Sequence, residues 1–246
     1  MRALRVLLIV VVILGVLFVV VDRVAVHFAQ GEVADKLRST EGLTSTPDVS
    51  INGFPFLTQV AGGELDDVEI GIKDYDAVGG TGTGAEKIRI DDLKAHMKGV
   101  EFSGDYSSAT AATATGTATI AYDELLKAAK SEPTRVAPGA TAQVVGLSDG
   151  GNGKIKVEID GTFLGVKLPH PVFVLSTVTV KGDTVQVRAD GLPDLGVDLA
   201  ENAVRSITDF QQAVDELPGG VRLDKVEAAS DGVEISVKGS NVKLAG

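Results

Sequence analysis

The chain has 246 residues, 44% hydrophobic and 23% charged, and this composition excludes wholesale disorder because it supplies enough apolar surface for a core. The absence of cysteine excludes disulfides, thiolate metal sites, a cysteine nucleophile and a lipidated N-terminal cysteine. The 23 basic and 34 acidic residues give a net charge of −11, or −13 without Arg2 and Arg5, and this balance lacks the electrostatic footprint of a nucleic-acid binder.

The first element in chain order is an apolar segment near the N-terminus. Residues 6–21 form an unbroken apolar run that ends at Asp22-Arg23. As a helix, Leu4–Val21 would be about 27 Å long, close to the ~30 Å of a bilayer core. An uncleaved signal-anchor and a cleaved signal peptide are the two alternatives, and the long run without an Ala-x-Ala site favours the anchor. The predicted anchor residues include Val6, Leu7, Ile9, Val12, Leu14, Leu17 and Val21.

This segment also predicts the organisation of the chain. Residues 1–21 are expected to form a single transmembrane span, and residues 22–246 one extracytoplasmic domain. A basic start before an apolar segment is the signature of export, which places the domain outside the cytoplasmic membrane. Cleavage after the run would instead give a secreted protein.

The elements that follow begin with a helix and two strands. Val26, Val33 and Leu37 recur at helical spacing, so the anchor is expected to continue as an amphipathic helix to about Arg38. Residues 48–51 are predicted to form a short strand. Alternation of Val68, Ile70 and Ile72 with polar residues then indicates a half-buried strand.

The middle of the chain is predicted to be rich in antiparallel strands. Residues 112–121 alternate small apolar residues with threonines, and residues 123–130 are predicted to form a short helix. Residues 144–160 and 172–188 each contain two apolar strands around a glycine-containing turn, which predicts two hairpins.

A second amphipathic helix is predicted near the C-terminus, before a final meander of strands over residues 221–244. Its apolar stripe runs from Ala203 to Leu217 and includes Ile207, Phe210 and Val214. Two striped helices among many alternating strands predict an α+β fold, with no sign of a parallel sheet.

Motifs that suggest catalysis or cofactors have simpler interpretations. Gly146-x-Ser148-x-Gly150 matches the nucleophile-elbow pattern, which requires a turn from strand into helix, but here it enters a hairpin turn. The G-x-G-x-x-A string at residues 80–85 precedes a strand, so no helix N-terminus is available for a pyrophosphate. No catalytic residue and no cofactor are predicted.

No metal site is predicted either. The histidines, His27, His96 and His170, lie far apart without metal-ligand spacing, and each is interpreted as a surface or packed side chain. The acidic pairs Asp66-Asp67 and Asp91-Asp92 are interpreted as solvated strand ends.

The segment Gly53-Phe-Pro-Phe is unusual for a solvent-exposed loop, and two interpretations stay open. It is either a turn that fills the core, since aromatic side chains bury large areas, or the lip of an apolar groove. The candidate lipid-binding residues are Ile51, Phe54, Phe56, Leu57, Val60, Ile207, Phe210 and Val214.

The same region carries a resemblance. Residues 49–59 read V-x-I-x-G-F-P-F-L-x-Q and residues 63–70 read G-x-L-x-x-V-x-I, with Asp22-Arg-Val before them and L-P-x-G-V-R-L from Leu217. These strings resemble an actinobacterial family of membrane-anchored or exported proteins, long catalogued as a domain of unknown function and typified by a mycobacterial lipomannan elongation factor. The resemblance implies a TULIP-like fold, in which a long curved antiparallel sheet wraps one or two amphipathic helices. It also implies binding of phospholipid or phosphoinositide in the cell envelope.

The expected function is therefore that of a membrane-anchored extracytoplasmic protein that binds lipid acyl chains in an apolar groove and supports cell-envelope lipid or lipoglycan handling. A two-chain lipid has roughly 30 methylenes, so its extraction into water would cost on the order of 24 kcal/mol and requires a long apolar surface. The alternatives are a non-enzymatic module that tethers a cell-wall partner, and a lipid hydrolase.

Overall fold

The computed structural model describes residues 2–79, 86–105, 107–128, 133–182, 184–191, 205, 208–213, 217 and 220–245. Contacts divide the chain into two compact units, each considered by itself below. Unit 1 comprises Met1–Ile72, Lys94–Thr115 and Gly239–Gly246, and unit 2 comprises Lys73–Leu93 and Gly116–Lys238.

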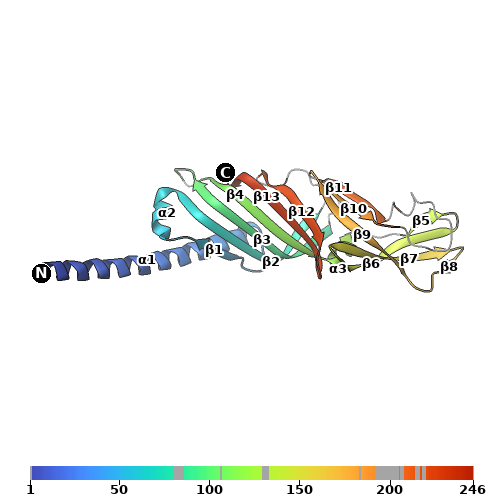
Figure 1. Cartoon of the computed structure of the whole chain (residues 1–246), viewed down its shortest axis with the longest axis horizontal. Coiled ribbons are helices and arrows are strands. Elements are labelled where there is room, and N and C mark those ends of the chain that lie inside the picture. The colour runs from blue at the N-terminus through green and yellow to red at the C-terminus, as the bar shows by residue number, and fades with distance from the viewer. Residues whose placement is uncertain are drawn as a thin grey trace. The chain divides into compact units, whose positions relative to one another are not determined.

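The described residues form helices and two antiparallel sheets (Figure 1). The helices are α1 (Arg2–Thr40), α2 (Phe56–Gly62) and α3 (Tyr122–Ala128). Sheet A has the strand order β1-β2-β3-β4-β13-β12, with β1 at Asp48–Asn52, β2 at Glu64–Gly79, β3 at Glu86–Phe102, β4 at Ala109–Ala121, β12 at Arg222–Ala228 and β13 at Gly232–Ala245.

Sheet B has the strand order β11-β10-β9-β7-β6-β5, with β8 beside β7. Its strands are β5 (Thr134–Ala137), β6 (Ala140–Gly151), β7 (Lys154–Phe163), β8 (Val166–Lys167), β9 (Val172–Lys181), β10 (Thr184–Ala189) and β11 (Phe210–Ala213). Each strand pair whose register is described is antiparallel, which confirms the predicted α+β class.

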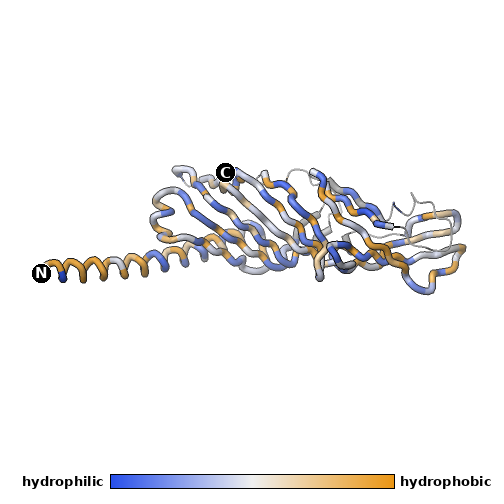
Figure 2. Tube along the Cα trace, viewed as in Figure 1, coloured by the Kyte–Doolittle hydropathy of each residue, from blue (hydrophilic) through white to orange (hydrophobic). Residues whose placement is uncertain are grey.

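The predicted continuation of the N-terminal helix is confirmed. α1 runs for 39 residues without a break and ends at Thr40, just before Gly42 with its positive φ of 62°. After Arg5 its N-terminal part is mostly hydrophobic (Figure 2). α1 is long and apolar enough to cross a membrane, a test that a signal sequence also passes. Val26 and Ala34, in the second half of α1, are buried in unit 1, where α1 contacts β1 and α2.

Alternation of side chains explains how β1 joins unit 1. Val49 and Ile51 are buried, and they lie opposite Ile70 and Val68 of β2 in the antiparallel register. Because successive residues of a strand point to opposite faces, this register puts the apolar residues of both strands on one face. The two strands predicted at these positions are confirmed.

Unit 2 contains both predicted hairpins, β6–β7 and β9–β10. Buried side chains of sheet B, α3, β12 and β13 form one hydrophobic cluster, in which Ile159 is only 2% exposed. Tyr122 of α3 belongs to this cluster and donates a hydrogen bond of 2.7 Å to the carbonyl oxygen of Ala229. The core of unit 2 therefore lies between sheet B and the strands β12 and β13.

The prediction of a second amphipathic helix is wrong over residues 210–213. These residues form β11, whose residue Phe210 lies opposite Val187 of β10. Helical spacing reports only local periodicity, whereas β10 would have unpaired backbone groups on one side without β11, and residues 210–213 satisfy them by forming another strand. Ile207 and Val214 lie outside the described residues, and only the backbone of Phe210 is described.

Candidate functional site

The segment Gly53-Phe-Pro-Phe is attached to α1 through Asp22, the first residue after the apolar run. The carboxylate of Asp22 accepts a hydrogen bond of 2.9 Å from the backbone N–H of Leu57, in the first turn of α2. Arg23 Nη2 lies 2.6 Å from the second carboxylate oxygen, and Asp22 itself is 0% exposed. We call this group, Asp22, Arg23, Phe54 and Leu57, the α1–α2 clamp.

The electrostatics of the clamp keep Asp22 ionised. Burial raises the pKa of Asp22, but hydrogen bonds from the backbone of Leu57, from the Arg23 side chain and from the backbone of Phe56 outweigh burial, so the net pKa lies below its ordinary value. The carboxylate is thus a charged cap on the N–H groups that begin α2.

The two phenylalanines of the motif have opposite environments. Phe56 is 7% exposed, whereas Phe54 is 57% exposed with the Arg23 guanidinium 5.1 Å from its ring centroid. Gly53 has a φ of +97°, and a Cβ at this position would lie 2.6 Å from Nε2 of Gln59. Phe56 therefore matches the first interpretation, a turn that fills the core. Phe54 does not fill the core and lies on the surface.

The other sequence-predicted lipid-binding residues are also located. Ile51 is buried in β1, and Leu57 and Val60 of α2 are partly buried. These residues belong to unit 1, whereas Phe210 belongs to unit 2. Lipid contact by any of these side chains stays a prediction.

A second apolar surface, which the sequence did not single out, lies in unit 2. Partly buried aliphatic side chains from both of its sheets pack against the fully buried cluster. We call this set the aliphatic wall; it comprises Val144, Leu147, Val172, Val178, Val180, Val185, Ile235 and Val237. Partial exposure depends on how β12, β13 and sheet B pack together, and this packing leaves no signal in the local sequence pattern.

Strand β9 shows how the wall is built. Val172, Val174, Val178 and Val180 share one face because side chains alternate along a strand, and Val174 in the middle is 5% exposed. Ser176 lies on the same face, fully buried, and its hydroxyl has no hydrogen-bond partner within the described part of the chain. On this face, the side chains at the centre of β9 are therefore buried, and those toward both ends are partly exposed.

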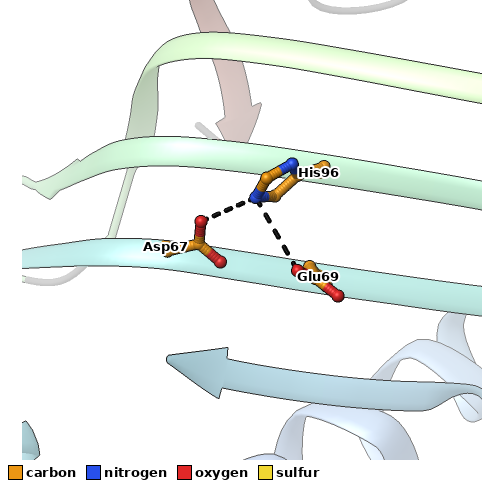
Figure 3. Close-up of side chains that lie close together, drawn as sticks. All are labelled: Asp67, Glu69 and His96. Atoms are coloured by element: carbon orange, nitrogen blue, oxygen red, sulfur yellow. Dashed lines mark hydrogen bonds and ion pairs between the residues drawn. The ribbon is translucent and has the colours of Figure 1, made fainter. Parts of the chain in front are cut away.

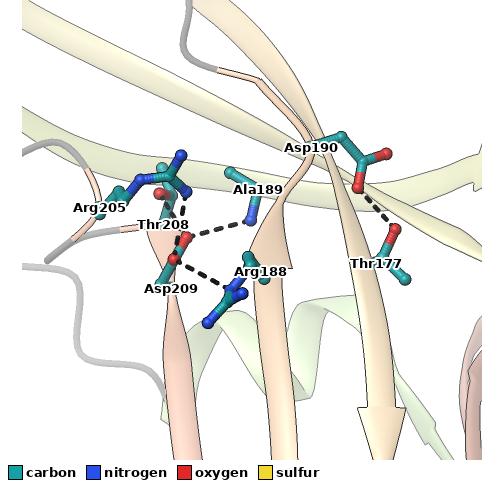
Figure 4. Close-up of polar contacts among 7 residues, drawn as sticks. All are labelled: Thr177, Arg188, Ala189, Asp190, Arg205, Thr208 and Asp209. Atoms are coloured by element: carbon teal, nitrogen blue, oxygen red, sulfur yellow. Dashed lines mark hydrogen bonds and ion pairs between the residues drawn. The ribbon is translucent and has the colours of Figure 1, made fainter. Parts of the chain in front are cut away.

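The opposite face of β9 contributes to a polar cavity of about 650 Å³. Arg188 and Arg205 both approach Asp209, at 3.9 and 3.5 Å, and the Thr177 hydroxyl donates to Asp190 at 2.6 Å (Figure 4). Hydrogen bonds from Lys154 and Thr177 lower the pKa of Asp190. Charged groups line this cavity, so it suits a polar group better than a hydrocarbon tail.

Sheet A brings one histidine into an acidic group. His96 Nε2 of β3 lies 2.6 Å from Asp67 Oδ2 and 3.8 Å from Glu69 Oε1, both on β2 (Figure 3). One potential ligand atom from each residue lies within 4.8 Å of the others. Asp66 is exposed near the start of β2, as predicted, but the side chain of Asp67 is only 23% exposed, so its interpretation as a solvated strand end is wrong. Asp91-Asp92 likewise lies within β3 and not at its end.

The nucleophile-elbow pattern has no elbow geometry. Ser148 lies within β6, directly opposite Lys156 of β7, and the strand continues to Gly151 before the turn. The required transition from strand to helix does not occur at this serine, which confirms the hairpin interpretation. The G-x-G-x-x-A string at residues 80–85 lies outside the described residues.

Comparison with known proteins gives one match. A family model described as LmeA-like phospholipid-binding matches residues 20–238, which includes the α1–α2 clamp and the aliphatic wall. No curated protein and no solved structure matches the chain.

Proposed function

The chain belongs to the LmeA-like phospholipid-binding family, and we propose on this premise that the aliphatic wall of unit 2 holds the acyl chains of a phospholipid. Family membership supports lipid binding as the activity and agrees with the α+β, TULIP-like architecture implied by the resemblance. The single observation that supports this location is a set of aliphatic side chains that pack against the buried core of unit 2 and stay partly exposed.

The energetics favour such a surface. Each methylene moved from water onto an apolar surface gains about 0.8 kcal/mol. Transfer from a bilayer to the wall replaces one apolar environment by another, so it is nearly isoenergetic and reversible. The cavity beside Arg188 and Arg205 would leave a hydrocarbon tail against charged groups and is therefore not the place for the acyl chains.

The proposed setting is the outer side of the cytoplasmic membrane. The basic residues Arg2 and Arg5 before the apolar run support an exported domain, and the uninterrupted helix α1 supports an anchored one. In this setting the protein would take part in handling cell-envelope lipids or lipoglycans, with phospholipid or phosphoinositide as ligand and the cytoplasmic membrane as the surface to which it is attached.

The proposed role is binding without catalysis. The family is described by a ligand and not by a reaction, and Ser148 lies inside a β-strand. The alternative is a protein that merely tethers a cell-wall partner. This alternative predicts that the aliphatic wall does not bind lipid.

The test compares two isosteric changes in unit 2. The double substitution Val178→Thr with Val180→Thr keeps side-chain shape but places hydroxyls on the wall, and Val166→Thr makes the same change at a position that is 71% exposed. The affinity for phospholipid is measured on the full chain in detergent, by displacement of a fluorescent phospholipid. The double variant should bind about tenfold more weakly, because two desolvated hydroxyls cost roughly 1–2 kcal/mol.

The Val166→Thr chain should bind lipid like the original protein. Native mass spectra should show phospholipid on both, and thermal unfolding should verify that the double variant is folded. A wild-type chain that never retains phospholipid would overturn the proposal and favour the tethering role. Equal affinity of all three chains would move the acyl-chain site away from the wall.

A further inference from the structure

Three exposed apolar side chains lie at the end of the membrane segment. Val24 is 52% exposed, Phe28 is 76% exposed and Phe54 is 57% exposed. Val24 and Phe28 are four residues apart on α1, so they are neighbours on the helix surface. Phe54 lies at the same level of α1, because the Arg23 guanidinium is 5.1 Å from its ring centroid. Apolar side chains this exposed are normal when scattered singly, but a group of them beside a membrane segment indicates contact with an apolar or amphipathic environment.

The positions of Val24 and Phe28 along α1 place them close to the boundary of the hydrocarbon core of a bilayer. The helical segment Leu4–Val21, which contains Arg5 and the whole apolar run, is about 27 Å long, some 3 Å shorter than a bilayer core of ~30 Å. This difference brings the hydrocarbon boundary to Asp22 and Arg23. Val24 then lies in the headgroup layer, and Phe28, about 6 Å further along the helix, points its side chain back toward that layer.

The α1–α2 clamp fixes unit 1 at the same level. Because Asp22 accepts the hydrogen bond from Leu57, the start of α2 must lie beside the end of the apolar run. α1 continues without interruption past this point and contacts β1 and α2. No flexible linker therefore separates the apolar run from the part of unit 1 that contains Phe54.

We propose that the clamp end of unit 1, formed by Gly53–Leu57 and by residues 24–28 of α1, lies in the headgroup layer of the bilayer that α1 spans. Phe54 acts there as an interfacial aromatic side chain, and Arg23 extends past its ring toward the lipid phosphates. The occupant of this surface is lipid and not a protein partner. The inference rests on the proposed membrane anchoring and adds a second contact with the bilayer.

The charges of the clamp fit this position. A carboxylate at the boundary of the hydrocarbon would be costly if it faced lipid, but Asp22 is enclosed by protein and paired with Arg23 and the Leu57 N–H. The side chain of Arg23 is 48% exposed, and long cationic side chains at helix ends extend toward the headgroups in this way. Aromatic side chains are enriched at the same depth.

The chain contains no tryptophan, so single tryptophans report the depth of chosen positions. We would place the full chain in phosphatidylcholine nanodiscs with brominated acyl chains and compare Phe54→Trp with Phe173→Trp. Phe173 is a matched control because it is 61% exposed and has Lys156 Nζ 4.5 Å from its ring centroid. Val12→Trp, in the middle of the apolar run, is the reference for the anchor.

Brominated lipid should quench Phe54→Trp at least about twofold, with a blue-shifted emission, because an interfacial ring lies within reach of the upper acyl chain. Val12→Trp should be quenched more strongly, and Phe173→Trp should keep its emission.

If Val12→Trp is quenched while Phe54→Trp behaves like Phe173→Trp, the interfacial contact is wrong although the anchor stands. If Val12→Trp is not quenched, anchoring and this inference fail together. A blue shift of Phe54→Trp without quenching would place the ring in a protein contact and also overturn the inference. Phospholipid displacement measured on the same variants remains the separate readout of the acyl-chain site.

Discussion

At the scale of single residues, Asp67 connects three strands of sheet A. Its carboxylate accepts a hydrogen bond of 2.9 Å from Asn52 of β1 and lies 2.6 Å from His96 of β3, while Asp67 itself belongs to β2. The hydrogen bond from Asn52, followed by that from His96, holds the pKa of Asp67 below its usual value. One ionised side chain thus contributes to the register of both of its neighbouring strands.

This pKa shift predicts a loss of stability in acid. Because the folded-state pKa of Asp67 lies below the unfolded value of about 3.9, its contribution is complete above that pH and disappears as the pH falls through the lower folded-state value. Asp67→Asn should lower the free energy of unfolding by about 1 kcal/mol at neutral pH. On acidification, the free energy of unfolding should then fall less in this variant than in the original chain.

Urea unfolding of the full chain at neutral pH and at about pH 3 measures both effects. Asp76→Asn, at an exposed position on the same strand, is the control and should follow the original chain. Equal acid sensitivity of the Asp67→Asn chain and the original chain would contradict this role of Asp67.

Residue-level contacts of this kind were the least predictable from sequence. Asp22 meets Leu57 across 35 positions, and Asp67 meets His96 across 29. Alternation shows which residues share the face of a strand, but the partner on the next strand depends on register, which a long strand does not reveal. The sequence showed that Gly53-Phe-Pro-Phe was unusual without showing which phenylalanine is buried.

At the scale of elements, Gly232 marks a close approach between strands. A Cβ at Gly232, the first residue of β13, would lie 2.2 Å from the carbonyl oxygen of Ile120 in β4. The obstacle is backbone, so it cannot rotate away as a side chain would. Glycine at this position therefore lets β13 start directly beside β4.

Gly232→Ala should consequently destabilise the protein by about 2–3 kcal/mol, because either strand must shift to relieve the overlap. Gly191→Ala is the matched control, since no atom lies within 4 Å of the Cβ it would add. Thermal unfolding followed by circular dichroism measures both variants. A Gly232→Ala chain with an unchanged melting temperature would show that the strands separate here at little cost.

Elements defined by local chemistry were predictable, and those defined by pairing were not. Asn152 and Gly153 have φ values of 54° and 71°, which is the two-residue turn chemistry that predicts the β6–β7 hairpin. The uninterrupted α1 followed from its apolar run and helical spacing. Residues 210–213 have helical spacing but pair with β10, so a tertiary contact determined their conformation.

At the scale of the whole molecule, the net charge determines how affinity responds to salt. Residues 22–246 carry a net charge of −13, counting 34 acidic residues against the 23 basic ones less Arg2 and Arg5. An acidic protein gains no overall attraction from anionic headgroups, so apolar contact must supply the affinity.

The affinity for phospholipid, measured by displacement, should therefore not fall when the salt concentration rises from about 50 to about 500 mM. With anionic lipid the affinity should rise slightly, because screening reduces repulsion. The measurement uses the full chain in nanodiscs of neutral and of mixed anionic composition. A weakening of threefold or more with salt would instead indicate a local cationic headgroup site.

The absence of a hinge in α1 limits how the protein can work. A helix of 39 residues without an internal break is stiff over its whole length, whereas a glycine- and serine-rich tether would let an attached domain explore a large volume. With α1 as the proposed membrane anchor, the part of unit 1 that α1 contacts would thus stay at one height relative to the bilayer and diffuse only sideways. Under the proposed anchoring, this part of unit 1 suits a stationary contact with the bilayer and not a shuttle between distant layers.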